Sequence, residues 1–569
     1  MPYQGRQPGV GVRNRFIFTA TSGQTSFSGA DSNGLTLKYP DATYTDVFLN
    51  GVLLPPTDYT ATTKTSVVLG SGAAVNDILE VVAYDIASIA NTVPTSGGTF
   101  TGPLTVEGNF TADGGTIKLD GNYPVGTGNV ALGDTALDSV EAGGTYNVAI
   151  GDSAGTAITT GDQNTILGYS AGVALTTGLR NTLLGSTAGD ALVGAERNTA
   201  VGYGALHTET EGDRSTAVGV FALSTQNTTG GGNIYNTAVG YGAGNVVTTG
   251  TNNTLLGGLA GDAITTGSNN TALGQHAAGK TTTASDNTAV GRTALYDNTT
   301  GSSNVAVGKE ALYFNTTASN NTAVGYQAGY SNTTGTEITA VGKGAMYSNT
   351  TGNYNTAVGY QTMRYNTTGS DNTAYGDEAL RSNTSGGKNT VSGNIALYAN
   401  TTGSNNTAFG MQALRFNTTA SNNTAVGYQS LYDNTTGANN QAVGNYALSN
   451  NTTGNSNQAM GYAALETNTT GANNVAIGST ALLSNTTAGE STAVGYQAGY
   501  NSTGQRNAFF GSEAGESNTS GQSNTYIGRQ AGTLMTTGSN NTILGRYTGN
   551  NGGLDIRTSS NNIVLSDGD

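Results

Sequence analysis

The sequence predicts an all-β chain whose greater part is an elongated parallel β-solenoid, a shaft in which each backbone turn stacks on the previous one. Three observations predict this class. A motif close to N-T-A-V-G-Y-x-A-L-Y-x-N-T-T-G-x-N returns from residue 129 almost to the C-terminus. The 569 residues include 86 Gly but only 8 Pro, with no Cys or Trp, a composition that excludes collagen and disulfide-rich folds. Short alternating apolar runs precede the repeat.

The repeat has a fixed length. One glycine of the motif recurs 25 times between Gly133 and Gly545, and 21 of the 24 intervals are 17 residues. This period is too short for a helical-hairpin repeat and suits one solenoid coil per repeat. At about 4.8 Å per coil, about 25 coils make a shaft on the order of 120 Å long.

The motif assigns a role to each part of a coil. The T-A-V triplet is rich in β-branched residues and predicts a short strand, and the glycine after it permits a tight bend. Asn stands four residues before that glycine in 22 of the 25 copies, the exceptions being Ser215, Ile338 and Ser491. One Asn per coil can form a ladder that satisfies backbone groups at a turn. The residues expected in this ladder include Asn129, Asn147, Asn164, Asn181, Asn253, Asn270, Asn287, Asn321, Asn406 and Asn423.

Two positions of the motif compensate each other in volume. Where the residue four after the glycine is Leu, as at Leu380, the residue three further on is Asn. Where it is Gly, as at Gly172, the later residue is usually aliphatic, as at Leu175. This pattern indicates one interior pocket filled from either side of the coil, with exceptions at Gly329, Gly499 and Gly515.

The core predicted for one coil is thin. Each coil offers few apolar side chains against the cost of ordering 17 residues, so an isolated chain would gain little from burial. We therefore expect a parallel homotrimer in which a second apolar face docks on identical chains.

The chain divides into four segments. Residues 1–88 contain alternating runs and an Asn50-Gly51 turn, which predict a small antiparallel β domain. Residues 89–128, with SGGTFTGPLTVEGNF, are expected to form a collar or linker. Residues 129–549 hold the 17-residue-repeat shaft, and residues 550–569 form a C-terminal segment in which the repeat decays.

Three stretches carry a family resemblance. The run YTDVFLNGVLLPPTDYTATTKTSVVLGSGAAVNDILEVVAYD is similar to the tail-docking domain of tail fibres from short-tailed bacteriophages, especially those of marine cyanobacteria. GGTFTGPL resembles the collar motif of phage fibres, and the NTAVG and NVAIG repeats resemble the head of trimeric autotransporter adhesins. The last resemblance implies a left-handed β-roll of three chains, although that family usually has a 14-residue coil.

The resemblance also implies function, partners and location. It implies a structural tail fibre that attaches the virion to the host cell surface, made in the host cytoplasm and released by lysis. The N-terminal domain would dock on adaptor or nozzle proteins of the tail, and the shaft would meet a host receptor such as a glycan. The terminal NNIVLSDGD resembles the segment that leads into a self-cleaving trimerisation chaperone, so we expect such a domain to have followed Asp569 and been removed.

Other functions find little support in the sequence. The formal net charge of −15 argues against nucleic acid as a partner, and no apolar run is long enough for membrane insertion. His207 and His276 are far apart in the chain, outside any metal or nucleophile motif, so we expect no catalytic residue, metal or cofactor. Carboxylates at Glu209, Glu211 and Asp213 are expected in solvated loops.

The recurring tyrosines are the one feature of the sequence that indicates a binding surface. Tyr follows the bend glycine at Tyr326, Tyr360, Tyr428, Tyr462 and Tyr496, where amphipathic rings can contact a glycan or pack between coils or chains. A second set includes Tyr296, Tyr313, Tyr330, Tyr347, Tyr398 and Tyr432. Two alternatives to a tail fibre stay open, a bacterial trimeric surface adhesin and a fibre-borne polysaccharide depolymerase.

Overall fold

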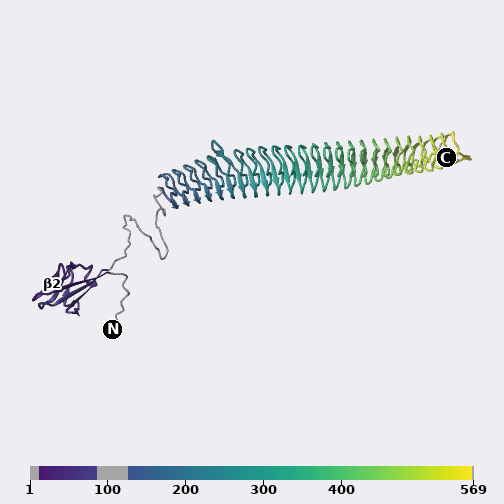
Figure 1. Ribbon diagram of the computed structural model, residues 1–569. Coiled ribbons are helices and arrows are strands. Elements are labelled where there is room, and N and C mark those ends of the chain that lie inside the picture. Colours follow the sequence, from purple (N-terminus) through teal and green to yellow (C-terminus); the bar gives the residue numbers. More distant parts are fainter. Residues whose placement is uncertain (1–11, 86–125, 567–569) are drawn as a thin grey trace. The chain divides into compact units, whose positions relative to one another are not determined.

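The structure, a computed structural model, describes residues 12–85 and 126–566. These residues belong to two compact units, a small N-terminal domain and a long repeat region (Figure 1). Their secondary structure consists of β-strands and a single short 3-10 turn, which confirms the all-β class and the parallel solenoid of 17-residue coils. Most of the collar segment expected at 89–128 lies outside the described residues.

The N-terminal domain contains two antiparallel sheets. The first has the order β1-β7-β3-β4 and the second the order β2-β6-β5. Its elements are β1 (Val12–Thr19), β2 (Gln24–Ser28), η1 (Ala42–Tyr44), β3 (Thr45–Leu49), β4 (Val52–Leu53), β5 (Tyr59–Thr60), β6 (Ser66–Ala73) and β7 (Ile78–Asp85). Phe27, Val47 and Leu79 lie in its buried core. Asn50 and Gly51, both with positive φ, connect β3 to β4, as a tight hairpin requires.

The shaft is one parallel sheet of 26 short strands, one strand per coil. These are β8 (Val130–Leu132), β9 (Val148–Ile150), β10 (Thr165–Leu167), β11 (Thr182–Leu184), β12 (Thr199–Val201), β14 (Thr216–Val218), β16 (Thr237–Val239), β17 (Thr254–Leu256), β18 (Thr271–Leu273), β19 (Thr288–Val290), β20 (Val305–Val307), β21 (Thr322–Val324), β22 (Thr339–Val341), β23 (Thr356–Val358), β24 (Thr373–Tyr375), β25 (Thr390–Ser392), β26 (Thr407–Phe409), β27 (Thr424–Val426), β28 (Gln441–Val443), β29 (Gln458–Met460), β30 (Val475–Ile477), β31 (Thr492–Val494), β32 (Ala508–Phe510), β33 (Thr525–Ile527), β34 (Thr542–Leu544) and β37 (Ile563–Leu565). Equivalent residues pair in register, so that Ala323 of β21 lies between Ala306 of β20 and Ala340 of β22.

We number the positions of a coil 1 to 17 from the asparagine before the strand, so that Asn321 to Glu337 form one coil. Position 3 of the strand points inward, and positions 2 and 4 point outward. Gly325 at position 5 has a φ of 137°, and a Cβ atom there would lie 2.6 Å from the carbonyl oxygen of Gly342 in the next coil. Glycine is required here both for its conformation and for the close stacking of coils.

Positions 7, 9 and 17 also adopt the left-handed conformation, whatever residue they hold. In the coil that precedes Asn321 these positions are Glu310 (φ 59°), Leu312 (φ 50°) and Asn320 (φ 62°). Such a conformation costs about 1–2 kcal/mol for an ordinary residue. Hydrogen bonds between coils offset this cost, because the N–H group of Leu312 donates to the carbonyl oxygen of Ala328 (2.9 Å).

The interior of the shaft is a single apolar core. Ala at positions 3 and 8, Leu at position 9 and the aliphatic residues at position 12 are all buried in it. Two of the irregular glycines lie next to a large residue that replaces the usual Ala at position 3, since a Cβ atom on Gly499 or Gly515 would lie within 2.7 Å of the Phe509 ring. A Cβ atom on Gly329 would lie 3.6 Å from Cδ1 of Ile338, which takes the place of a ladder asparagine. In these coils a large side chain at one position therefore fills the space that a glycine leaves at another.

The shaft has two larger departures from the regular coil, besides one 18-residue and one 16-residue interval. The 21-residue interval between Gly219 and Gly240 contains an exposed segment at residues 229–233, where β15 (Gly232–Asn233) pairs with β13 (Gly212–Asp213) of the preceding coil. Beyond residue 549, a hairpin of β35 (Asn550–Asn551) and β36 (Leu554–Asp555) leads into β37, which pairs with β34. The repeat sheet therefore continues to Leu565, one coil further than the spacing of the glycines indicates.

The pairing of Gly329 with Ile338 can be tested by a double-variant experiment. Ile338→Asn alone should destabilise its coil by about 2–4 kcal/mol, because the cavity beside Gly329 stays empty. Adding Gly329→Leu should recover most of that loss, since Leu occupies this position with the same positive φ in other coils. Hydrogen exchange at the amides of Thr339 to Val341 measures the change locally. Equal protection in the two variants would contradict the compensation.

Candidate functional site

The asparagines at position 1 form a buried row along the shaft. All ten residues expected in this row are buried. In most coils the Nδ2 atom donates to the carbonyl oxygen at position 15, as Asn321 does to Gly335 (2.9 Å). The Oδ1 atom accepts from the backbone N–H at position 1 of the next coil, as Asn304 does from Asn321 (3.0 Å). Each side chain thus satisfies two backbone groups, one in the turn and one at the start of a strand.

A second row of asparagines at position 12 forms a ladder of side-chain amides, which the sequence reasoning did not recognise. Asn366 Nδ2 donates to Asn349 Oδ1 (2.8 Å), and Asn383 Nδ2 donates to Asn366 Oδ1 (2.7 Å). The same Nδ2 atom of Asn366 also donates to the carbonyl oxygen of Gly369 (2.9 Å). This row is continuous from Asn298 to Asn485. The only sequence signal was the recurrence of Asn at position 12 in most coils that have Leu at position 9.

In the coils around Ser215, a different buried hydrogen-bond network interrupts the two asparagine rows. Gln226, at position 12, donates through Nε2 to Ser215 Oγ (2.9 Å) and to Glu209 Oε2 (2.9 Å). Asn236 Nδ2 donates to Gln226 Oε1 (2.9 Å). The carboxylate of Glu209 accepts from the backbone N–H of Gly212 (2.8 Å). Glu209 is therefore a buried structural group, and the expectation that it lies in a solvated loop is wrong.

The five tyrosines predicted to meet a glycan share one row at position 6, and they differ in exposure. Tyr326, Tyr360, Tyr462 and Tyr496 are exposed by 40–56%, whereas Tyr428 is half-buried. Tyr428 packs edge-on against Tyr446 (ring centroids 5.3 Å apart), which in turn contacts Tyr462 (6.1 Å). Lys309 lies 5.5 Å from the ring centre of Tyr326, and Lys343 lies 5.8 Å from that of Tyr360.

The second tyrosine set forms a closer array at position 10. Tyr296, Tyr313, Tyr330 and Tyr347 stack in consecutive coils, with ring centroids 5.3, 5.4 and 4.9 Å apart. Burial raises the pKa of Tyr313 and Tyr330 above the ordinary tyrosine value. The row continues with arginines: the guanidinium carbon of Arg364 lies 5.2 Å from the ring centre of Tyr347.

The two histidines lie apart on the shaft surface. His207 Nδ1 lies 2.5 Å from Asp190 Oδ1, and His276 packs edge-on against Tyr296. Burial raises the pKa of Asp190 despite this partner. Within residues 12–85 and 126–566, no three His, Cys, Asp or Glu residues come together as a metal site would require. In the same ranges no helix has the length and apolarity needed to cross a membrane.

Comparisons of the chain with protein-family models, with curated proteins and with solved structures found no match.

Removing one member of the position-12 ladder should open the shaft locally. Asn366→Ala leaves Asn349 Oδ1 without its partner and removes one of the two hydrogen bonds of Asn383 Nδ2 and of the Gly369 carbonyl, and a buried polar group left unpaired costs about 1–3 kcal/mol. We expect amide hydrogen exchange in residues 349–383 to accelerate by about 30-fold or more. Asn450→Ala is the matched control, because this residue is exposed. Unchanged exchange in Asn366→Ala would contradict a stabilising role of the ladder.

Proposed function

We propose that the protein is a tail fibre of a bacteriophage, a non-catalytic trimer that links the virion to the host cell surface through its solenoid shaft. In this proposal the shaft is a left-handed β-roll in each of three parallel chains. The fibre is made in the host cytoplasm, becomes part of the virion and leaves the cell by lysis. The observation that carries the proposal is a row of outward-facing apolar residues, present in all but one coil, on a shaft whose other outward positions are mostly polar.

This row lies at position 4, the last residue of each strand. It is aliphatic or aromatic in 25 of the 26 coils, Ser392 being the exception. Its members are Leu132, Ile150, Leu167, Leu184, Val201, Val218, Val239, Leu256, Leu273, Val290, Val307, Val324, Val341, Val358, Tyr375, Phe409, Val426, Val443, Met460, Ile477, Val494, Phe510, Ile527, Leu544 and Leu565. Met460 is 50% exposed and Phe409 44%. An isolated soluble chain rarely leaves so extended an apolar surface in water, so this row favours association along the shaft.

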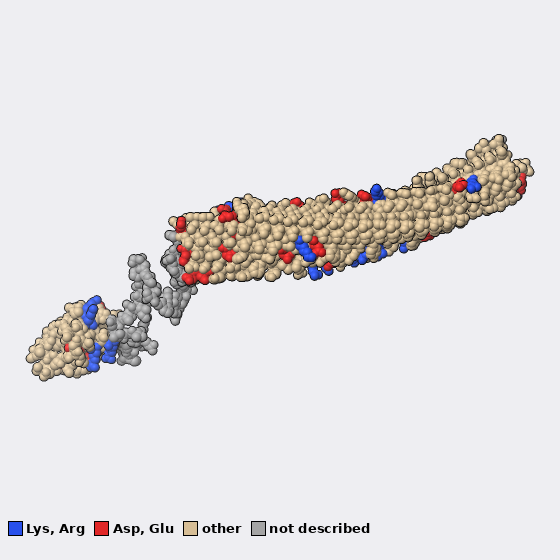
Figure 2. All heavy atoms as spheres, turned by 45° about the horizontal axis from the view of Figure 1, so that its top comes forward, with Lys and Arg blue, Asp and Glu red and all other residues tan. Residues whose placement is uncertain are grey.

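Association of identical chains accounts for the uniformity of this row. Strands at one level present the same residue types, so parallel chains in register bring apolar side chains together at every coil. Most of the shaft surface seen in Figure 2 belongs to uncharged residues, with acidic and basic groups scattered along it. The number three comes from the resemblance of the NTAVG repeats to trimeric adhesin heads.

The N-terminal domain is the part that we assign to the tail. Its edge strand β4 exposes Val52 (66%) and Leu53 (55%), which are apolar side chains available to a partner. Within the described residues β4 pairs only with β3. Docking of this edge on adaptor or nozzle proteins would cover both side chains and would leave the shaft free to reach the host.

The oligomeric state is directly measurable. The purified full chain should sediment at three times its 57.2 kDa mass. Val324→Glu combined with Val426→Glu should weaken the trimer, because charges placed in an apolar interface lose their hydration. Thr334→Glu with Thr436→Glu is the control, since these positions lie in the same coils and are exposed. A wild-type chain that sediments as a monomer would contradict the proposed trimer.

The assignment to the virion calls for a separate experiment. Gold-labelled antibodies against the full chain should decorate projections at the tail of virions purified from an infected host. Excess soluble fibre, added to host cells before the virus, should slow adsorption by occupying the receptors. Label restricted to uninfected cell surfaces would favour the bacterial adhesin instead, and breakdown of host surface glycans by the purified chain would favour the depolymerase.

A further inference from the structure

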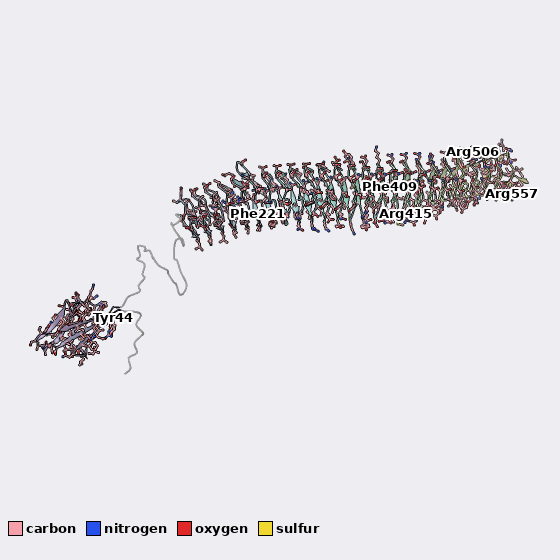
Figure 3. All side chains as sticks on the ribbon, viewed as in Figure 1. Tyr44, Phe221, Phe409, Arg415, Arg506 and Arg557 are labelled. Atoms are coloured by element: carbon pink, nitrogen blue, oxygen red, sulfur yellow. The ribbon has the colours of Figure 1, made fainter. Side chains whose placement is uncertain are left out.

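A row of aromatic and cationic side chains runs along position 10 over nine consecutive coils. It consists of Tyr296, Tyr313, Tyr330, Tyr347, Arg364, Arg381, Tyr398, Arg415 and Tyr432. Neighbours along the row are in contact: Arg381 Nη1 donates to the Tyr398 hydroxyl (2.5 Å), and Arg415 Nη1 donates to the Tyr432 hydroxyl (2.9 Å). Figure 3 places Arg415 at the lower edge of the shaft, away from Arg506 at the upper edge. We call this row the tyrosine–arginine column.

Two arginines of the column have no acidic partner. Arg381 forms an ion pair with Glu378 (3.3 Å). Among the described residues, Arg364 and Arg415 form none. The Nε atoms of both are buried and have no hydrogen-bond partner. Two guanidinium groups without a carboxylate partner in the same row of the shaft indicate an anionic ligand.

Exposed rings accompany the column at a regular interval. At position 11, Phe314, Tyr365 and Phe416 are 38%, 41% and 39% exposed and follow one another at 51 residues, which is three coils. Phe314 packs edge-on against Tyr330, and Phe416 against Tyr432 (both 5.1 Å). Arg364 and Arg381 both lie against Tyr365 (5.5 and 5.2 Å). The surface thus repeats an exposed aromatic ring about every 14 Å, and arginines lie against two of the three rings, Tyr365 and Phe416.

The column is distinct from the apolar row at position 4. The position-4 row follows all 26 strands, as a contact along the whole shaft requires, whereas the column occupies only nine coils. Packing between chains therefore does not explain why Tyr and Arg gather in these coils alone. A ligand that meets one segment of the shaft does explain it.

We infer that the tyrosine–arginine column binds an extended acidic polysaccharide, one whose sugar units carry carboxylates. Arg364 and Arg415 would pair with the carboxylates, and the exposed rings at position 11 would pack against the apolar faces of the sugars. The repetition over three-coil intervals suits a polymer of regular units better than a compact ligand. The inference rests on the proposed attachment function and assigns the segment of the fibre that recognises the host.

Binding of the full chain to polygalacturonate and to alginate, measured by calorimetry at 0.15 M salt, tests the inference. Both polymers should bind, and polygalacturonate whose carboxylates are methyl-esterified should bind about tenfold more weakly or less. Arg364→Gln with Arg415→Gln should reduce the affinity about tenfold or more. Arg506→Gln is the control, because Arg506 is an exposed arginine paired with Glu490 in a distant coil, and it should leave the affinity unchanged.

A second pair of variants separates ring contacts from charge. Phe314→Ala with Phe416→Ala should weaken binding of polygalacturonate and leave the weaker binding of polyglutamate unchanged. Thermal unfolding and sedimentation show whether each variant keeps its fold. Equal affinity for polyglutamate and polygalacturonate, or binding of neither acidic polysaccharide, would overturn the inference. If the soluble fibre still slows virus adsorption in that case, the attachment function stands and only the assignment of the column fails.

Discussion

Every coil of the shaft must satisfy the backbone polar groups of its own turns, and the rest of the structure depends on this constraint. A strand of three residues leaves most of the 17-residue coil outside the sheet, where backbone bonds between coils, such as that from Leu312 N–H to the Ala328 carbonyl, satisfy only part of the polar groups. The two asparagine rows meet the need from inside, since Asn321 and Asn332 both donate to the carbonyl oxygen of Gly335. Because each amide is bonded to the next coil as well, a coil is complete only when its neighbour is in place.

This constraint explains how the repeat tolerates irregular residues. An unusual side chain is accepted where a second residue restores the missing partner or volume. Gln226 reaches the hydrogen-bonding site that Ser215 is too short to fill, and Ile338 occupies the space beside Gly329. In both cases the compensating residue lies at another position of a coil. Two conditions therefore govern the interior: the buried side chains must together fill its volume, and every buried polar group must have a hydrogen-bond partner. Different residues can meet these conditions at the same interior position.

The sequence was sufficient to predict those parts of the coil whose conformation follows from the local preferences of their residues. Thr322 to Val324 favour a strand and Gly325 favours a bend, so the period, the strand and the parallel stacking could be predicted. The left-handed conformation of Leu312 could not be predicted, because leucine has no preference for this conformation and only the stacking of coils imposes it. The amide ladder through Asn366 was also missed. Spacing gives residue types along the chain and does not tell whether a side chain points into the coil or away from it.

Binding surfaces on such a shaft are hard to predict from sequence for a related reason. Tyr326 and Tyr330 belong to one coil and look alike in the repeat, yet Tyr326 is exposed whereas Tyr330 stacks between Tyr313 and Tyr347. Outward positions are free of the hydrogen-bonding constraint that fixes the interior, so their residues can change from coil to coil without loss of the fold. Position 4 nevertheless stays apolar in every coil except that of Ser392, and position 10 departs from the rest of the shaft over nine coils. Neither pattern is needed to complete a coil, which is why we propose that each serves a contact that the isolated chain does not make.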